Sequence, residues 1–444
     1  MSVSSLPFLH GALAAVLPKL AAWRRDFHAH PEAGWTEFRT AALIIRRLRE
    51  LGYAIRMGEA ACASDRRMGV PSSAVLAAAR ERALEHGADA ELVAGMGDGY
   101  TGFWADLDCG PGPVTAFRFD MDCNEVAECA EESHRPVREG FASRWPGLMH
   151  ACGHDGHAAV GLGLAEVLVS IRRHLRGRIR LIFQPAEEGA RGALPMSEAG
   201  AVDGVDVLFG FHIGFKAEGP GSLICGTQGF LATTKRDVLF SGVPAHAGAA
   251  PEEGKDALLA ACSAVVNLHA ISRNGKGGTR IAVGRLEGGE ARNVIPASAR
   301  LFMETRGETT ELDAYMTAES ERILRASADL WGCACEWRTV GNSAGGGSSP
   351  ELARLIATVA EAMGGWKTVI PMSGFGATED FACLMSRVQA SGGLASYLQV
   401  GTDRAAGHHS DRFDFDETCL GRALELLARL AVRMAGGGQE DTET

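Results

Sequence analysis

The sequence lacks the features of two large classes of protein. No stretch of its 444 residues approaches the roughly 18 uninterrupted apolar residues that a membrane-spanning helix needs. Basic residues are in the minority, with 44 Lys and Arg against 55 Asp and Glu, and the net charge of -11 would repel a phosphate backbone. We therefore expect no membrane insertion and no nucleic acid partner.

Signals for secretion are also missing. No basic segment precedes the short apolar patch at residues 13–17, and Pro18 and Lys19 follow it directly, so no secretory signal is predicted. The eleven cysteines are an odd number without a repeated spacing, which favours reduced thiols over a disulfide framework. These features predict a cytoplasmic protein.

Helical and strand patterns alternate along the first half of the chain. Buried strands are expected at residues 114–122, 178–188 and 205–214, and a long helical pattern separates the first two. A helical segment rich in Ala, Glu and Arg interrupts this order at residues 57–99. The alternation predicts an α/β fold with a mostly parallel central sheet covered by helices on both faces.

The pattern then changes to βαββαβ, the order of a ferredoxin-like α+β unit. This unit is predicted at residues 228–340 and is followed by a glycine-rich segment that we interpret as a flexible return linker. We expect the first domain to comprise residues 1–227 and 341–436, with the second domain inserted between these parts. The polar residues 437–444 are expected to be disordered.

Side chains that commonly bind metals gather at the ends of these predicted strands. The motif HACGHDGH offers the thiolate of Cys152 and the imidazole of His154 at the start of a helix. Glu187 and Glu188 follow one buried strand, where two adjacent carboxylates repel each other unless a cation or a proton compensates. His212 ends a further strand. Because ligands of open α/β sheets bind outside the carboxyl ends of the strands, this convergence predicts a site for zinc, manganese or iron.

Two more segments add donors to this set. Asp120 and Asp122 end the remaining strand, and the late loop AAGHHSDRF offers His408 or His409 as a last ligand, with the other histidine in a structural role. The sequence also contains the pattern G-x-S-x-G around Ser343, which is typical of serine hydrolases. A nucleophilic serine of that kind requires a helix that begins at the serine, and the following glycines delay the helix here, so this alternative is disfavoured.

Five segments resemble the M20 peptidase family of di-metal amidohydrolases and carboxypeptidases: RRDFHAHPEAG, FRFDMD, HACGHDGHAA, FQPAEEGARGA and GEARNVIP. They occur in family order over nearly the whole chain and are most similar to the aminoacylase and hippurate hydrolase branch. Within it, the helical segment at 57–99, RPVREGFAS and AAGHHSDRFDFDE resemble the A subunits of aminobenzoyl-glutamate hydrolases. The resemblance implies a di-metal exopeptidase-like catalytic domain with an inserted ferredoxin-like lid and dimerisation domain.

The resemblance also implies the reaction and the partners. We expect hydrolysis of the amide bond of small N-acyl or N-aroyl amino acids, such as aminobenzoyl-glutamate, with two divalent ions, Mn²⁺ or Zn²⁺, per chain. The expected protein partner is a second copy in a homodimer or a related B subunit in a heterodimer. The alternatives are an aminoacylase for another N-acyl amino acid and a non-catalytic subunit of a hetero-oligomer, against which the intact Glu187 argues.

Roles for individual residues follow from the same resemblance. Glu187 matches the general base, which takes a proton from water and passes it to the leaving amine. Asp122 matches the aspartate that orients the site, and Arg118 and Asp120 lie on its strand. The five metal ligands of the family fall on Cys152, His154, Glu188, His212 and His409.

Contacts with the substrate and across a dimer interface are implied for three further residues. His246, in SGVPAHAGAAPEEGKDA, matches the histidine that reaches the site of the opposite chain and donates to the oxyanion. Asn293 and Arg306 match contacts with the substrate carboxylate, to which the arginine fork is suited. The plainer alternatives are a loop or helix-cap histidine for His246 and an ion pair on a strand face for Arg306.

One segment of the expected site departs from the family. Glu379 and Asp380 in GATEDF match a polar segment that lines the site, but Ala377 and Thr378 stand where the branch has Gly-Ser. The role of Glu379 therefore stays open at this stage.

Overall fold

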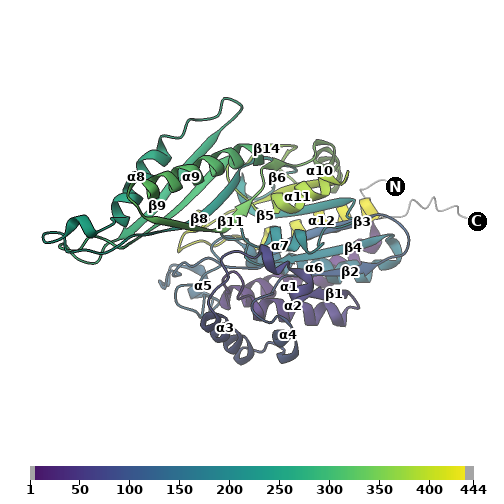
Figure 1. The fold of residues 1–444 in the computed structure, drawn as a ribbon. Coiled ribbons are helices and arrows are strands. Elements are labelled where there is room, and N and C mark those ends of the chain that lie inside the picture. Colours follow the sequence, from purple (N-terminus) through teal and green to yellow (C-terminus); the bar gives the residue numbers. More distant parts are fainter. Residues whose placement is uncertain (1–5, 436–444) are drawn as a thin grey trace, which may run out of the picture.

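A sheet of eight strands forms the centre of the larger domain in the computed structural model, which describes residues 6–435 (Figure 1). The predicted tail at 437–444 lies outside these residues. In spatial order the strands are β1 (Ala54–Met57), β2 (Phe103–Asp108), β4 (Arg178–Gln184), β3 (Val114–Asp120), β5 (Val207–Glu218), β15 (Leu394–Thr402), β6 (Ser222–Ile224) and β13 (Thr368–Ile370). The four central strands are parallel, and antiparallel pairs join β1, β2 and β6 to them. The predicted α/β fold class is confirmed.

Helices cover both faces of this sheet. One face carries α1 (Pro7–Ala29), α2 (Phe38–Glu50), α6 (His154–Ser170), α10 (Pro350–Met363) and α12 (Thr418–Ala435), and the other carries α7 (Ala193–Glu198) and α11 (Phe381–Ala390). In β3, Phe117 and Phe119 pack into the first core, whereas Ala116 packs into the second. Apolar residues are therefore needed on both sides of each central strand, which explains the continuous hydrophobic runs in the sequence.

The helical segment predicted at residues 57–99 packs against α2. It contains η1 (Gly58–Ala61), η2 (Ser64–Arg66), α3 (Ser73–Glu85) and α4 (Ala90–Gly95). Two further short helices, α5 (Arg135–Arg138) and η3 (Arg172–His174), lie later in the chain, outside this segment. Ser72 and Asp89 cap α3 and α4, because each side chain accepts a backbone N–H of the first turn. Cys62 joins Trp35, Tyr100 and Ala186 in a small buried cluster, so the segment also reaches the chain beside Glu187.

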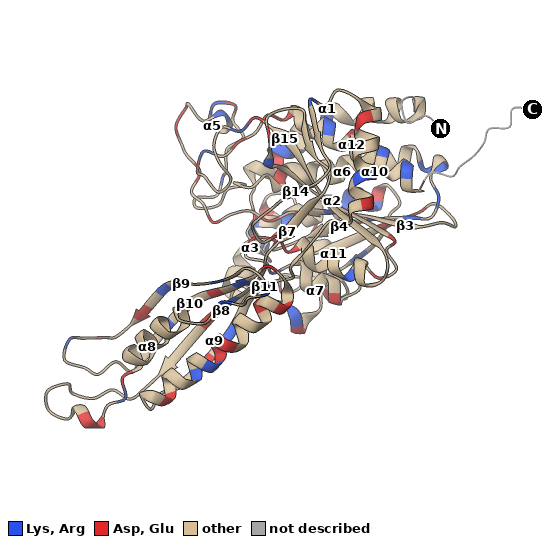
Figure 2. Ribbon diagram, turned by 90° about the horizontal axis from the view of Figure 1, so that it is seen from above, with Lys and Arg blue, Asp and Glu red and all other residues tan. Residues whose placement is uncertain are grey.

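The smaller domain projects from the larger one (Figures 1 and 2). It consists of β8 (Ala232–Ser241), η4 (Pro251–Glu253), α8 (Ala257–His269), β9 (Thr279–Gly288), β10 (Ser298–Gly307), α9 (Thr310–Leu330) and β11 (Ala334–Ser343). The strands form an antiparallel sheet in the order β11-β8-β10-β9, and both helices pack on one face of it. The predicted ferredoxin-like order of elements is present. We propose residues 228–340 for this domain, whose first strand begins at Ala232 and whose last strand continues to Ser343.

The segment predicted as a flexible linker is ordered, which corrects that expectation. Ser343 ends β11 and pairs with Thr233 of β8, and β12 (Gly346–Gly347) joins a three-stranded sheet with β7 (Thr227–Phe230) and β14 (Ser373–Gly374). The glycines permit close packing, since a Cβ atom at Gly341 would lie 2.2 Å from the carbonyl oxygen of Gly189. The two connections to the smaller domain therefore leave the larger one side by side.

No helix within residues 6–435 combines the length and the apolar character that crossing a membrane requires.

Candidate metal centre

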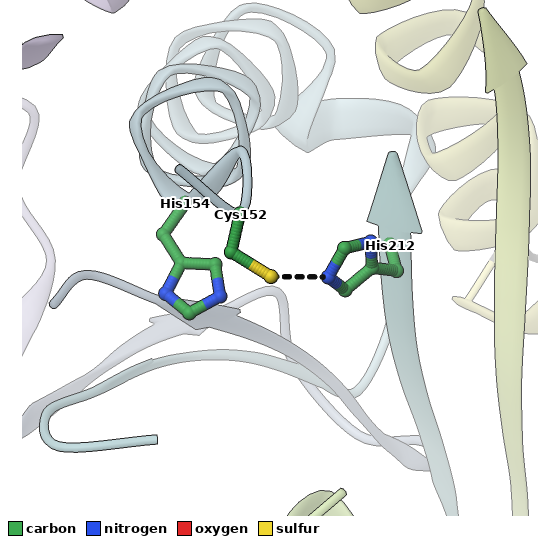
Figure 3. A group of neighbouring side chains, drawn as sticks. All are labelled: Cys152, His154 and His212. Carbon is green, nitrogen blue, oxygen red and sulfur yellow. Dashed lines mark hydrogen bonds between the residues drawn. The ribbon is translucent and has the colours of Figure 1, made fainter. Parts of the chain in front are cut away.

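Three donor side chains meet at the carboxyl ends of the central strands. Cys152 precedes α6, His154 is its first residue, and Gly153 between them adopts a φ of 95°, which lets the chain turn sharply into the helix. His212 comes from β5, and its Nε2 atom lies 3.4 Å from the sulfur of Cys152 (Figure 3). The ligand atoms of these three residues all lie within 4.8 Å of one another.

A second group of donors shares the thiol of Cys152. Glu188 and His409 join it, again with all three ligand atoms within 4.8 Å, and the Nε2 atom of His409 lies 3.3 Å from Oε1 of Glu188. The backbone of His409 has a φ of 64° and its N–H donates to the carbonyl of Ala151, 2.7 Å away. The late loop is therefore fixed directly beside the motif that carries Cys152.

His408 lies beside this group but has no free ring nitrogen. Its Nδ1 is 2.8 Å from a guanidinium nitrogen of Arg404, and its Nε2 is 3.2 Å from the carbonyl oxygen of Ile213. A histidine needs an unoccupied ring nitrogen to bind a metal. We therefore propose His409 rather than His408 as the last ligand.

The donor set fits divalent cations. His154 is 1% exposed, its Nδ1 donates to the carbonyl of Asp122 at 2.8 Å, and its Nε2 is buried without a hydrogen-bond partner among the described residues. A buried polar atom without a partner is costly, and a cation beside it would remove that cost. Thiolate, imidazole and carboxylate together are ligands that zinc and manganese accept.

Two buried carboxylates fix the chain that carries Glu187 and Glu188. The oxygens of Asp122 accept the backbone N–H groups of both residues at 3.0 Å each, and Glu37 accepts the N–H of Ala186 at 2.8 Å. Ala186 itself has a φ of 49°. Three consecutive N–H groups are thus held, which orients both glutamate side chains toward the donors; the contribution of Glu37 was not predicted.

An acidic network that includes Glu379 lies beside Glu187. Arg118 is fully buried and donates to Asp120 at 2.5 Å and to Glu379 at 2.9 Å. Asp380 accepts the N–H groups of Gly192 and Ala193 through one oxygen, while the other oxygen is 2.7 Å from the side-chain amide of Gln184. Glu379 therefore shares the charge of Arg118 with Asp120 and Asp380, and its carboxylate lies within 4.8 Å of the donor atoms of Glu187 and Asp380.

The surroundings shift the pKa values of the two adjacent glutamates, Glu187 and Glu188, in opposite directions. Burial raises the pKa of Glu187 well above its usual value, and repulsion by Glu379 and Glu188 adds to this effect. Burial also opposes the charge of Glu188, but the imidazoles of His409 and His154 outweigh it and lower the pKa to about 2. Glu188 thus stays ionised as a ligand should, while Glu187 has affinity for a proton.

His157 contributes a contact that the sequence did not reveal. Its Nε2 accepts the backbone N–H of Ile213 at 2.9 Å, so Nδ1 carries the proton and donates to Asp120 at 2.6 Å. This hydrogen-bonded ring joins α6 to the strand that carries His212. Its position three residues after His154, one helical turn further on, was the only signal in the sequence.

The strand that carries His212 differs from its prediction. We expected it to end near this residue, but β5 continues to Glu218 after four residues that bulge out of the pairing with β15. Tertiary pairing with β15 extends the strand beyond the apolar run.

The predicted lid residues do not gather at the metal centre of their own chain. His246 and Asn293 lie at the end of the smaller domain furthest from the larger one, beyond β8 and before β10. Arg306 lies at the near end of β10 and its Nε is 2.8 Å from a carboxylate oxygen of Glu304. Ten residues of extended strand, about 33 Å, separate the two ends.

A buried ion pair behind the centre gives a test of stability. Arg24 of α1 is fully buried and donates to Asp155, the neighbour of His154, at 2.8 Å and to Asp414 at 2.9 Å. Removing one partner of a buried pair leaves an uncompensated charge, so Arg24→Met should lower the free energy of unfolding by about 3–5 kcal/mol. The control Arg25→Met removes partly exposed ion pairs with Glu139 and Glu417 and should cost about 1 kcal/mol or less. Urea denaturation of both variants measures the difference, and equal losses would contradict it.

The fold and this centre are typical of metal-dependent hydrolases. The chain belongs to peptidase family M20/M25/M40, whose sequence profile matches residues 116–433. This membership confirms the resemblance found in the sequence and the prediction of an amidohydrolase with divalent metal ions.

Individual relatives extend the match to nearly the whole chain. The chain is 46% identical over 420 residues to the A subunit of the p-aminobenzoyl-glutamate hydrolase of Escherichia coli, covering 94% of this chain and 96% of that protein. It is 44% identical over 429 residues to the indole-3-acetyl-aspartic acid hydrolase of Enterobacter agglomerans, covering 96% and 98%.

Solved structures agree with the sequence comparison. The aminobenzoyl-glutamate utilization protein of Klebsiella pneumoniae superposes with a TM-score of 0.81 at 39% identity, covering 96% of this chain and 98% of that one. A dinuclear metal-binding peptidase of the M20 family from Bacillus subtilis gives a TM-score of 0.64 at 25% identity, covering 95% and 99%.

Proposed function

We propose that the chain hydrolyses the amide bond between an aromatic acyl group and an acidic amino acid, with aminobenzoyl-glutamate as the leading substrate. The observation that carries this proposal is Glu187 beside two donor groups that share Cys152. The names of the two relatives described above support the substrate class, because each combines an aromatic acyl group with glutamate or aspartate. Another N-acyl amino acid remains the alternative substrate.

Cys152, His154 and His212 would hold one divalent ion, and Cys152, Glu188 and His409 a second. We propose Mn²⁺ or Zn²⁺ for both positions, because both accept this mixture of sulfur, nitrogen and oxygen donors. When bound, such ions acidify a water molecule and polarise the carbonyl of the scissile amide.

The residues of the chain perform the proton transfers. The Glu187 carboxylate accepts a proton from water while the water oxygen bonds to the carbonyl carbon of the amide. It then delivers this proton to the nitrogen of the leaving amino acid, and the C–N bond breaks. Asp122 keeps Glu187 and Glu188 in place through their backbone N–H groups. Arg306, after release from Glu304, is proposed to bind the substrate carboxylate together with Asn293 of a second chain, because Asn293 lies at the far end of its own smaller domain.

A dimer follows from the position of His246, which we propose completes the site of a second chain. Its Nδ1 accepts the N–H groups of Gly248 and Ala249, at 3.2 and 3.1 Å, which leaves the Nε2–H free to donate. The smaller domain also offers a surface for association. Strand β9 is an edge strand. Helix α8 contains no Lys, Arg, Asp or Glu (Figure 2), and its Leu259 and Val266 side chains are exposed.

The identity of the second chain is part of the proposal. A second copy would give a homodimer. The alternative is a related B subunit, because the Escherichia coli relative is named as one lettered component of its hydrolase. All eleven cysteines are free, which supports the cytoplasm as the compartment.

Metal analysis and a substrate panel together test this function. The purified protein should contain stoichiometric Mn²⁺ or Zn²⁺, lose activity in chelator, and regain it when either ion is added back. It should hydrolyse aminobenzoyl-glutamate faster than N-acetyl amino acids. Full activity in chelator without bound metal, or no hydrolysis of any N-acyl amino acid by the metal-loaded protein, would overturn the proposal.

A further inference from the structure

A four-residue bulge interrupts β5 immediately after His212. Ile213 still pairs with Val400 of β15, but pairing resumes only at Glu218 opposite Thr402. Residues 214–217 therefore face the single intervening residue of β15, and the N–H of Lys216 donates to the side chain of Gln399 at 2.8 Å. Bulges beside active sites commonly redirect a side chain.

The side chain that this bulge redirects is Phe215. Gly214 and Phe215 both have positive φ angles, 74° and 64°. Glycine adopts this conformation freely, whereas a bulky residue does so at a cost in energy. A turn alone would be better served by a second glycine, so the aromatic ring itself needs an explanation.

The ring of Phe215 lies beside the donors of the metal centre. Its centroid is 5.2 Å from that of His212 and 5.0 Å from that of His408. It stacks on Phe375 at 4.7 Å with an interplanar angle of 23°, and Phe375 is only 4% exposed. Phe215 is only partly buried, so a rigid aromatic surface remains accessible next to a proposed ligand.

Aromatic rings stack favourably on one another at these distances, which makes such a surface a selective contact for an aromatic group. The substrate's acyl group is attached to the carbonyl that reacts at the centre, so it must extend into the space beside the donors. Phe215 lies on the same strand as His212, β5, and its partly buried ring contacts the ring of His212.

We propose that Phe215, supported by Phe375, binds the aromatic ring of the acyl group and so selects N-aroyl over N-acetyl amino acids. This inference rests on the proposed hydrolase function and assigns one feature of its specificity. The contact acts equally before and during bond cleavage, so it governs the ratio of kcat/KM between the two classes of substrate.

Two substrates with the same amino acid, N-benzoyl-glutamate and N-acetyl-glutamate, test this assignment. Phe215→Leu should lower kcat/KM for the benzoyl substrate by about tenfold or more, because the aromatic contact is lost. Its kcat/KM for the acetyl substrate should stay within about twofold, since a methyl group has no aromatic face to stack on the ring. Phe215→Tyr keeps the ring and should preserve the wild-type ratio, which also covers the case in which the leucine variant folds poorly.

Lys216→Ala is the matched control, because Lys216 belongs to the same bulge and its side chain is exposed. It should leave both substrates unchanged. Equal losses on both substrates in Phe215→Leu, or a preserved benzoyl preference, would overturn the inference while leaving the hydrolase function intact. A wild-type protein that cleaves neither substrate would instead overturn the proposed function.

Discussion

Replacing Glu187 with glutamine is expected to lower kcat by a factor of about 10² to 10⁴, the usual contribution of a general acid–base group. Glutamine preserves the size of the side chain but removes the proton acceptor. The loop should keep its shape, because Asp122 holds the backbone N–H of residue 187 rather than its side chain. Metal content should stay near normal, since the substitution also relieves the repulsion among Glu187, Glu379 and Asp380.

The neighbouring residue provides the control for this experiment. Glu188→Gln should lose metal occupancy, because Glu188 lies in the donor group with Cys152 and His409. Steady-state kinetics with elemental analysis of both variants separates the two roles. Wild-type turnover in Glu187→Gln, or equal metal loss in both variants, would show that the base is misassigned.

The second large effect concerns His246, which should act on the neighbouring chain. Removing one donor to a developing oxyanion typically reduces turnover by about 10² to 10³. We expect this loss in His246→Ala, with an unchanged unfolding transition and full metal content, because the side chain is exposed and far from its own centre. Kinetics, thermal unfolding and metal analysis check the three parts of the prediction.

A mixing experiment distinguishes a shared site from a local defect. A dimer of one His246→Ala chain and one Glu187→Gln chain contains one site with both groups intact. If equal amounts exchange at random in a homodimer, half the dimers are mixed and about a quarter of the wild-type activity should return. No recovery despite demonstrated exchange of chains, or a fully active monomer, would contradict the shared site.

The general architecture was predictable from local patterns. Apolar runs with helices between them identified the central strands, and the βαββαβ order identified the inserted unit, because each pattern reflects burial within one element. The family motifs were equally informative, since short segments such as HACGHDGH combine several donors within one helical entry. These features depend on residues that are close together in the chain.

Features that depend on distant pairing were not predictable. Glu37 reaches the backbone of Ala186 across 149 positions of sequence, and neither residue indicates the other. The bulge at Phe215 exists only because β15 pairs on both sides of it. The order in the glycine-rich segment after Ser343 likewise comes from strands contributed by other parts of the chain.

The side-by-side connections of the smaller domain have a topological consequence. Thr233 and Ser343 are directly paired in adjacent antiparallel strands, where Cα atoms are about 5 Å apart. A two-residue turn can close a gap of this size. Residues 234–342 therefore form an insertion that leaves and re-enters the larger domain at adjacent positions. The order of strands in the eight-stranded sheet is consequently the same with or without this insertion. Gain, loss or exchange of the whole module during evolution would require no rearrangement of the strands that carry the metal donors.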